Sequence, residues 1–165
     1  MKNCHIFIKG NNNTIIIADN VKAIGAEFWI EDDKNTINID QGTYIAGKTH
    51  FACTEGQSIS VGKKCLFSTD VVIRTGDSHS IIDDTGKRIN PALPVTIGNH
   101  VWVGNKVTIC KGSTIPDNCI VGTSCVVTKQ IKDSNSVIVG IPGRVIKRDV
   151  NWDIRRLPFS VRRAN

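Results

Sequence analysis

Residues 97–131 read IGNHVWVGNKVTICKGSTIPDNCIVGTSCVVTKQI, and an aliphatic side chain returns at every sixth position. This first track consists of Ile97, Val103, Ile109, Ile115, Val121 and Val127. A second track of mostly small or medium side chains follows four residues behind the first: Val101, Val107, Ser113, Cys119, Cys125 and Ile131. A period of six fits neither an α-helix, whose period is about 3.6, nor strands with turns every 8 to about 12 residues. It predicts a solenoid whose short strands stack about 4.8 Å apart and bury both tracks in one narrow core.

The same spacing continues, less regularly, toward the N-terminus. Three further triplets at six-residue steps are expected to face inward: Ile17, Ala23 and Trp29; Ile39, Ile45 and Phe51; Val61, Phe67 and Ile73. Between consecutive triplets, from Trp29 to Ile39 and from Phe51 to Val61, the step is ten residues instead of six. We therefore expect about four extra residues in a bulged corner at each of these two junctions.

A long polar segment interrupts the repeat between Arg74 and Pro94. We expect one loop, over about residues 75–94, to protrude from an otherwise all-β solenoid. Loops of this length are uncommon inside compact domains, so this loop is predicted to carry function. The coils end after Ile131, and the chain is expected to divide into a β-helix domain over residues 1–148 and a C-terminal arm or short helix over residues 149–165. Trp152 would pack this arm against the last coil or a neighbouring subunit.

Composition limits the possible classes of protein. With 165 residues, 40% of them hydrophobic and only 5% aromatic, the chain suits one domain with an aliphatic core. No N-terminal apolar run is long enough for a signal peptide or a membrane span, so we expect a cytoplasmic protein whose six cysteines are reduced. No metal site is expected, because paired cysteine spacings are absent.

The formal net charge of +6 raises the question of a polyanionic partner. No helix-turn-helix, zinc-finger spacing or aromatic-rich basic sheet accompanies this charge, so no nucleic acid is expected. Many of the basic residues crowd into the C-terminal quarter of the chain. Such a cluster suits a phosphorylated cofactor or a polyanionic substrate equally well.

Three motifs, together with the hexads, carry a family resemblance. They are IGNHVWVG from Ile97, VVTKQI from Val126 and VGIPGRVIK from Val139. In series they resemble the hexapeptide-repeat acyltransferases, which fold as a left-handed parallel β-helix. The loop sequence GDSHSIID from Gly76, followed by GKRINP from Gly86, is most similar to bacterial capsular and lipopolysaccharide O-acetyltransferases. The resemblance implies a homotrimer that uses acetyl-CoA and has each active site in a cleft between adjacent subunits.

The resemblance also assigns roles to particular residues. His79 matches the catalytic histidine and would be the general base, while Trp102 matches the tryptophan that lines the cleft for acetyl-CoA and acceptor. Asn105 would lie near the thioester of the cofactor, and Thr123 and Thr128 would contact its pantetheine arm. Lys129 and Lys147 would lie near its phosphates. The chain departs from the family in having GTSC from Gly122 where GAGS is usual. It also lacks the long N-terminal helical extension of the sugar acetyltransferases, which disfavours a small free sugar as acceptor.

The chemistry of such a site follows from general principles. A hydroxyl is a poor nucleophile at neutral pH, and an imidazole can remove its proton as the oxygen attacks a thioester. Asp77, two residues before His79, is a carboxylate that could orient the ring, and a backbone carbonyl would serve as well. We therefore expect O-acetylation of a sugar in a bacterial surface polysaccharide, with a polyanionic polysaccharide or its precursor as acceptor.

Two alternatives of other kinds stay open. The same base could N-acetylate an amino sugar or an aminated antibiotic, and a β-helix could also be a non-catalytic scaffold. The polar loop around His79 argues against a scaffold. Zinc enzymes with this fold bind metal through three histidines, but His50, His79 and His100 do not reproduce the spacing of those ligands.

Overall fold

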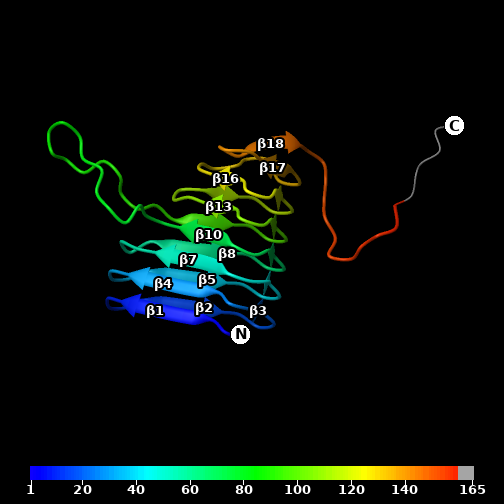
Figure 1. The fold of residues 1–165 in the computed structure, drawn as a ribbon, viewed down its shortest axis with the longest axis horizontal. Coiled ribbons are helices and arrows are strands. Elements are labelled where there is room, and N and C mark those ends of the chain that lie inside the picture. Colours follow the sequence, from blue (N-terminus) through cyan, green and yellow to red (C-terminus); the bar gives the residue numbers. More distant parts are fainter. Residues whose placement is uncertain (160–165) are drawn as a thin grey trace.

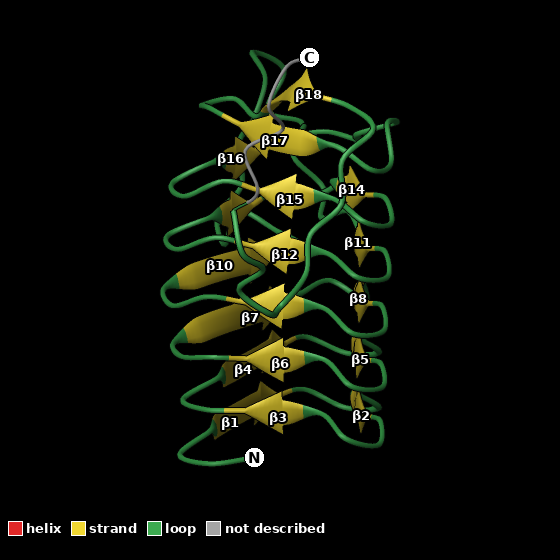
Figure 2. Ribbon diagram, turned by 90° about the vertical axis from the view of Figure 1, so that its right-hand side faces the viewer, coloured by secondary structure: helices red, strands yellow, loops and turns green. Residues whose placement is uncertain are grey.

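The computed structural model describes residues 1–159, and within them the chain forms three parallel sheets that make the three faces of a prism (Figures 1 and 2). The first sheet contains, in stacking order, β1 (His5–Lys9), β4 (Glu27–Glu31), β7 (Thr49–Cys53), β10 (Val71–Arg74), β13 (Thr108–Ile109) and β16 (Val126–Val127). The second sheet contains β2 (Thr14–Ile17), β5 (Thr36–Ile39), β8 (Ser58–Val61), β11 (Val95–Ile97) and β14 (Thr114–Ile115). The third sheet contains β3 (Lys22–Ala23), β6 (Tyr44–Ile45), β9 (Leu66–Phe67), β12 (Trp102–Val103), β15 (Ile120–Val121), β17 (Val137–Val139) and β18 (Arg144–Lys147).

Each turn of the solenoid visits the first, second and third sheets in that order. Val103 pairs with Val121, so a turn in the regular part takes 18 residues, which is three hexads. The pairing of Ala23 with Ile45, and of Ile45 with Phe67, shows that the earlier turns take 22 residues each. Strands β17 and β18 pair antiparallel and end the stack.

Both tracks of the regular stretch are buried, as the hexads predict. Every member of the two tracks between Ile97 and Ile131 is at most 7% exposed. Ser113, the polar member, satisfies its hydroxyl by donating to the Val127 carbonyl at 3.1 Å. The predicted inward triplets that begin at Ile39 and Val61 are also buried. The core is therefore one aliphatic column, widened by the stacked rings of Phe28 and Phe51.

The prediction for Trp29 is wrong. Its neighbours Phe28 and Ile30 face the core, while Trp29 points outward with 37% of its surface exposed and stacks on Phe7. The four extra residues of each early turn do not lie in the corner alone, because they also lengthen the strands on either side to four or five residues. In a longer strand two alternate residues face inward, so a step of six residues no longer identifies which residue faces the core.

The corners are tight enough to select their residues. A Cβ atom on Gly62 would lie 2.5 Å from the carbonyl oxygen of Gly98 in the next turn, so only glycine allows this approach. Other corners use left-handed backbone at non-glycine positions, such as Lys106, Asn118 and Ser124 with φ of 56°, 59° and 59°. Stacking at the strand spacing therefore depends on the corner sequence as well as on the aliphatic tracks.

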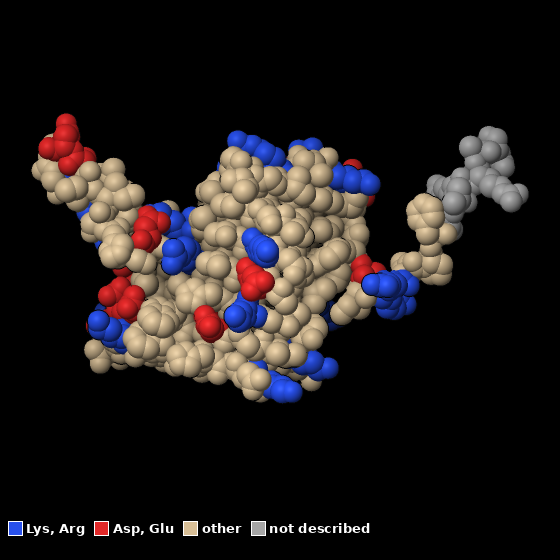
Figure 3. Space-filling view, viewed as in Figure 1, with Lys and Arg blue, Asp and Glu red and all other residues tan. Residues whose placement is uncertain are grey.

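Two segments leave the prism on opposite sides (Figures 1 and 3). Residues 75–94 form the predicted protruding loop, which leaves the end of β10 and returns at β11, on the edge between the first and second sheets. After β18 the chain is an arm without helix, and its residues 160–165 lie outside the described part. The arm turns back along the third sheet (Figure 2), so Trp152 packs near His100 and Trp102, in an earlier turn than the expected last one.

Candidate active site

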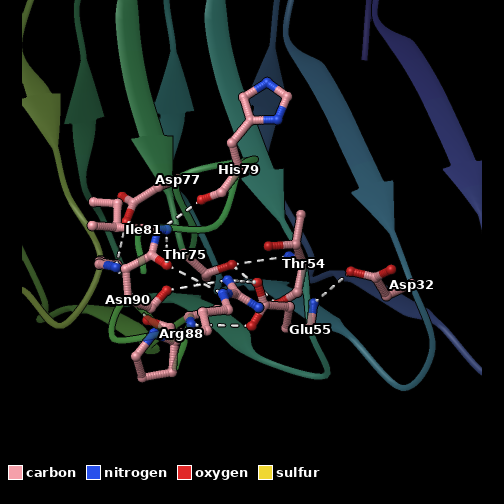
Figure 4. Close-up of polar contacts among 12 residues, drawn as sticks. Asp32, Thr54, Glu55, Thr75, Asp77, His79, Ile81, Arg88 and Asn90 are labelled. Carbon is pink, nitrogen blue, oxygen red and sulfur yellow. Dashed lines mark hydrogen bonds and ion pairs between the residues drawn. The ribbon is translucent and has the colours of Figure 1, made fainter. Parts of the chain in front are cut away.

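Asn90 is the centre of a hydrogen-bond network at the base of the loop (Figure 4). Its side-chain amide donates to the Asp77 carboxylate at 2.9 Å and to the His79 carbonyl at 2.8 Å. Its oxygen accepts from the Ile81 amide at 2.7 Å and from Arg88 Nε at 3.2 Å. Only 6% of Asn90 is exposed. One buried side chain therefore ties together the outgoing and returning halves of the loop, a role that the sequence analysis missed.

Two ion pairs fasten this network to the solenoid. Arg88 Nη2 lies 2.6 Å from Glu55 on the corner between β7 and β8, and Lys111 Nζ lies 2.5 Å from Asp77. The hydrogen bond from Arg88 lowers the pKa of Glu55. Hydrogen bonds from Lys111, and then from Asn90, lower the pKa of Asp77. Both carboxylates are thus ionised at neutral pH and hold the loop at its root.

His79 is exposed on this anchored loop. Its backbone carbonyl belongs to the Asn90 network, but its ring is directed away from that network (Figure 4). The Asp77 carboxylate is engaged by Lys111 and Asn90, and within residues 1–159 it has no hydrogen bond to the His79 ring. The backbone at His79 is therefore fixed while its imidazole is available to a ligand.

The structure divides the other predicted site residues between two sides of the prism. Thr128 and Lys129 follow β16 and lie on the same edge as the loop. Trp102 points outward from the third sheet with 39% of its surface exposed, and Asn105 and Thr123 lie at corners between the third and first sheets. In a triangular prism the loop edge lies opposite the third sheet. His79 and Trp102 of one chain therefore do not share one site.

Trp152 extends the aromatic surface around Trp102. Its ring stacks on His100 at 4.3 Å, its Nε1 donates to the His100 carbonyl at 2.7 Å, and its centroid lies 6.0 Å from that of Trp102. A cavity of about 430 Å³ lies between this part of the arm and the third sheet, where Tyr44 and Leu66 form part of its wall. The indole of Trp152 therefore belongs to the surface that carries the predicted cleft residue.

A basic hollow lies at the C-terminal end of the solenoid. Figure 3 shows Lys and Arg side chains gathered over that end. The hollow holds about 380 Å³, and its basic wall consists of Lys129, Lys132, Arg144 and Arg148. Lys147 lies beside it on β18, whereas Arg148 is already paired with Asp133 at 3.1 Å. Such a cluster attracts phosphate groups.

Two kinds of feature are absent from residues 1–159. No group of three or more His, Cys, Asp or Glu side chains is arranged to hold a metal ion. No helix in that part of the chain is long and apolar enough to cross a membrane.

Comparison with known proteins gives consistent similarities, although no protein-family profile matches the chain. The chain is 39% identical over 149 residues to the polysialic acid O-acetyltransferase of Neisseria meningitidis, across 90% of this chain and 68% of the relative. It is 30% identical over 141 residues to the galactoside O-acetyltransferase of Escherichia coli K12, across 82% and 68% of the two chains. Among solved structures, the polysialic acid O-acetyltransferase OatWY has a TM-score of 0.88 at 37% identity, with 96% and 74% coverage. The polySia-specific acetyltransferase NeuO has a TM-score of 0.72 at 28% identity, with 93% and 78% coverage.

These similarities define the class of protein as left-handed parallel β-helix acyltransferases, which confirms the fold predicted from the hexads. The chain belongs to the hexapeptide-repeat acetyltransferase family. The two curated relatives described above are O-acetyltransferases, so the expectation of an enzyme rather than a scaffold is also confirmed.

Proposed function

We propose that the protein transfers the acetyl group of acetyl-CoA to a hydroxyl of a bacterial surface-polysaccharide sugar, with His79 as general base. The observation that carries this proposal is the position of His79, whose ring is free while the backbone around it is tied to Asn90. A catalytic group needs a fixed position and an accessible reactive atom, and this loop provides both.

The reaction needs only direct transfer. A nitrogen of the His79 imidazole accepts the proton of the acceptor hydroxyl as its oxygen attacks the thioester carbonyl carbon. The carbon–sulfur bond then breaks, and the imidazolium returns its proton to the leaving sulfur. The acceptor gains an acetyl ester and coenzyme A leaves as its thiol. A positioned base of this kind contributes roughly 10² to 10⁴ in rate.

The acting enzyme is proposed to be a homotrimer in the cytoplasm. His79 and Trp102 lie on opposite sides of one prism, so a cleft containing both needs a second copy of the chain. In this arrangement the loop of one subunit faces Trp102, Asn105 and Thr123 of its neighbour. A monomeric active enzyme in light scattering at micromolar concentration would contradict the shared cleft.

The cofactor is proposed to lie with its phosphates at the basic hollow. Lys129 lines the hollow and Lys147 lies next to it, while Thr128 precedes Lys129 on the same edge. Lys129→Glu and Lys147→Glu should raise KM for acetyl-CoA more than they lower kcat, because they act on cofactor binding. Unchanged KM values in both variants would remove these two assignments.

His79→Ala tests the proposed base. We expect a fall in kcat of roughly 10² or more with an unchanged fold, because an exposed loop side chain contributes little to the solenoid core. Ser80→Ala, a change at the next exposed loop position, is the matched control and should retain activity. The acetylated product should lose its acetyl group in mild base, as an ester does and an amide does not. Retention of most activity by His79→Ala would place the base elsewhere.

A further inference from the structure

A second hollow lies on the outer face of the first sheet, at the root of the loop. It holds about 240 Å³, and its polar wall consists of Glu31, His50, Thr54, Arg74 and Ser78, with Trp29 forming the aromatic part. Ser78 is the residue before His79. The hollow therefore lies beside the proposed base within the same chain, unlike the surface around Trp102.

Arg74 is the unusual member of this wall. Its Nε atom is buried without a hydrogen-bond partner, and no ion pair to its guanidinium exists within residues 1–159. The two carboxylates that anchor the loop already have cations, since Asp77 pairs with Lys111 and Glu55 with Arg88. A buried donor without a partner is costly, so its presence needs an explanation such as a strained side chain, an ordered water or an ion. No hydrogen bond or ion pair engages the terminal nitrogens of Arg74 within residues 1–159, so they are open to an anion in the hollow that Arg74 lines.

Trp29 provides a flat apolar surface in the same hollow. Its ring stacks on Phe7 with centroids 4.1 Å apart and an interplanar angle of 22°, so its orientation is fixed. His50 lies 6.4 Å from it and is itself held by Glu27 at 3.1 Å. A rigid aromatic face with a few polar groups around it is typical of a small-molecule binding site.

We propose that this hollow binds an acidic sugar unit of the acceptor, with the carboxylate on Arg74 and the ring against Trp29. The inference rests on the proposed transferase function and adds the substrate class, a carboxylated sugar. A carboxylate, rather than a cofactor phosphate, is assigned to Arg74 because the basic hollow at the C-terminal end of the solenoid already provides several cations for phosphates. Glu31 and Thr54 remain to accept and donate hydrogen bonds with the sugar hydroxyls.

The test compares two acceptors, a short oligomer of sialic acid and its carboxyl methyl ester, in which each carboxylate charge is removed by adding one methyl group. The wild type should show a kcat/KM at least 10-fold higher for the acid. Arg74→Gln should lower kcat/KM for the acid by about 10- to 100-fold, the range expected for a hydrogen-bonded charge pair, and change that for the ester less than about 3-fold. Trp29→Leu should lower kcat/KM for both acceptors. Lys22→Gln changes an exposed residue on the third sheet and should alter kcat/KM for neither.

Other outcomes would overturn the assignment. Equal losses for both acceptors in Arg74→Gln, or a raised KM for acetyl-CoA, would make Arg74 a structural or cofactor residue. Acetylation of neutral sugars as fast as acidic ones would reject the acidic acceptor while leaving O-acetyl transfer intact. If the wild type transfers the acetyl group to no acceptor, the proposed function fails. Titration calorimetry with the sialic acid oligomer then tests the binding site independently of activity. Binding that Arg74→Gln abolishes supports the site, and no binding by the wild type rejects it.

Discussion

Replacing Asn90 by alanine should release the loop over residues 75–94 without unfolding the solenoid. The substitution removes four hydrogen bonds, of which two join Asn90 to the charged groups of Asp77 and Arg88. A neutral bond contributes about 1 kcal/mol and a bond to a charged group about 1.5 to 3 kcal/mol. Water recovers part of this at the exposed partners, so we expect the closed loop to lose about 3 kcal/mol, which is roughly a 10²-fold increase in opening.

Hydrogen exchange followed by mass spectrometry measures this opening directly. Peptides within residues 75–94 should exchange roughly 10² times faster in Asn90→Ala, while exchange of peptides from β7 and β8 should be unchanged. The value of kcat should also fall, because His79 is no longer held in a fixed position. Thr85→Ala is the matched control, because it removes a hydroxyl bond to Asp83 at the loop tip and leaves the Asn90 network intact. If exchange in the loop changes less than about 3-fold in Asn90→Ala, or changes equally in both variants, then Asn90 does not hold the loop closed.

Three further predictions concern acid, the thiols and the arm. The partners of Asp77 and Glu55 lower the pKa values of these two carboxyl groups, so the groups stabilise the loop fully above the ordinary carboxyl range. This stabilisation is lost as the pH falls through the lowered pKa values, so loop exchange corrected for intrinsic rates should accelerate below the ordinary carboxyl range of about pH 4. Unchanged protection throughout that acid range would contradict the anchoring role. Burial raises the pKa of Cys65 to about 11, so a thiol reagent at pH 8 should modify Cys65 far more slowly in the folded protein than in the unfolded protein. Mass spectrometry at timed intervals measures this modification, and rapid labelling of the folded protein would disprove the burial of Cys65. Trp152→Ala should detach residues 151–159, at a local cost of about 2 kcal/mol. Proteolysis of the arm should become faster while the solenoid keeps its melting temperature. An arm that stays resistant would show that the His100 stack is not its anchor.

The regular half of the solenoid could be predicted from the sequence because its information is local. A hexad places one aliphatic residue inward per strand, and the tight corners require glycine or residues that accept positive φ, so Ile97 to Ile131 determined both the strands and their stacking. The loop boundaries at 75 and 94 were predictable for the same reason, since the repeat stops and restarts there. Where turns lengthen to 22 residues the rule fails, as Trp29 shows, because longer strands have two inward residues and no fixed phase.

The site depended on contacts that spacing does not encode. Asn90 and Arg88 return from the far side of the loop to meet Asp77 and Glu55, and the sequence separations of 13 and 33 residues carry no periodic signal. The placement of His79 and Trp102 on opposite sides of the prism was equally hidden, because it follows from which edge the loop leaves and which face β12 occupies. Sequence by itself therefore determined the fold class and the loop, since these follow from repeated local geometry. Only the tertiary structure decided how the site is divided, since stacking brings distant residues together and separates others that are close in the chain.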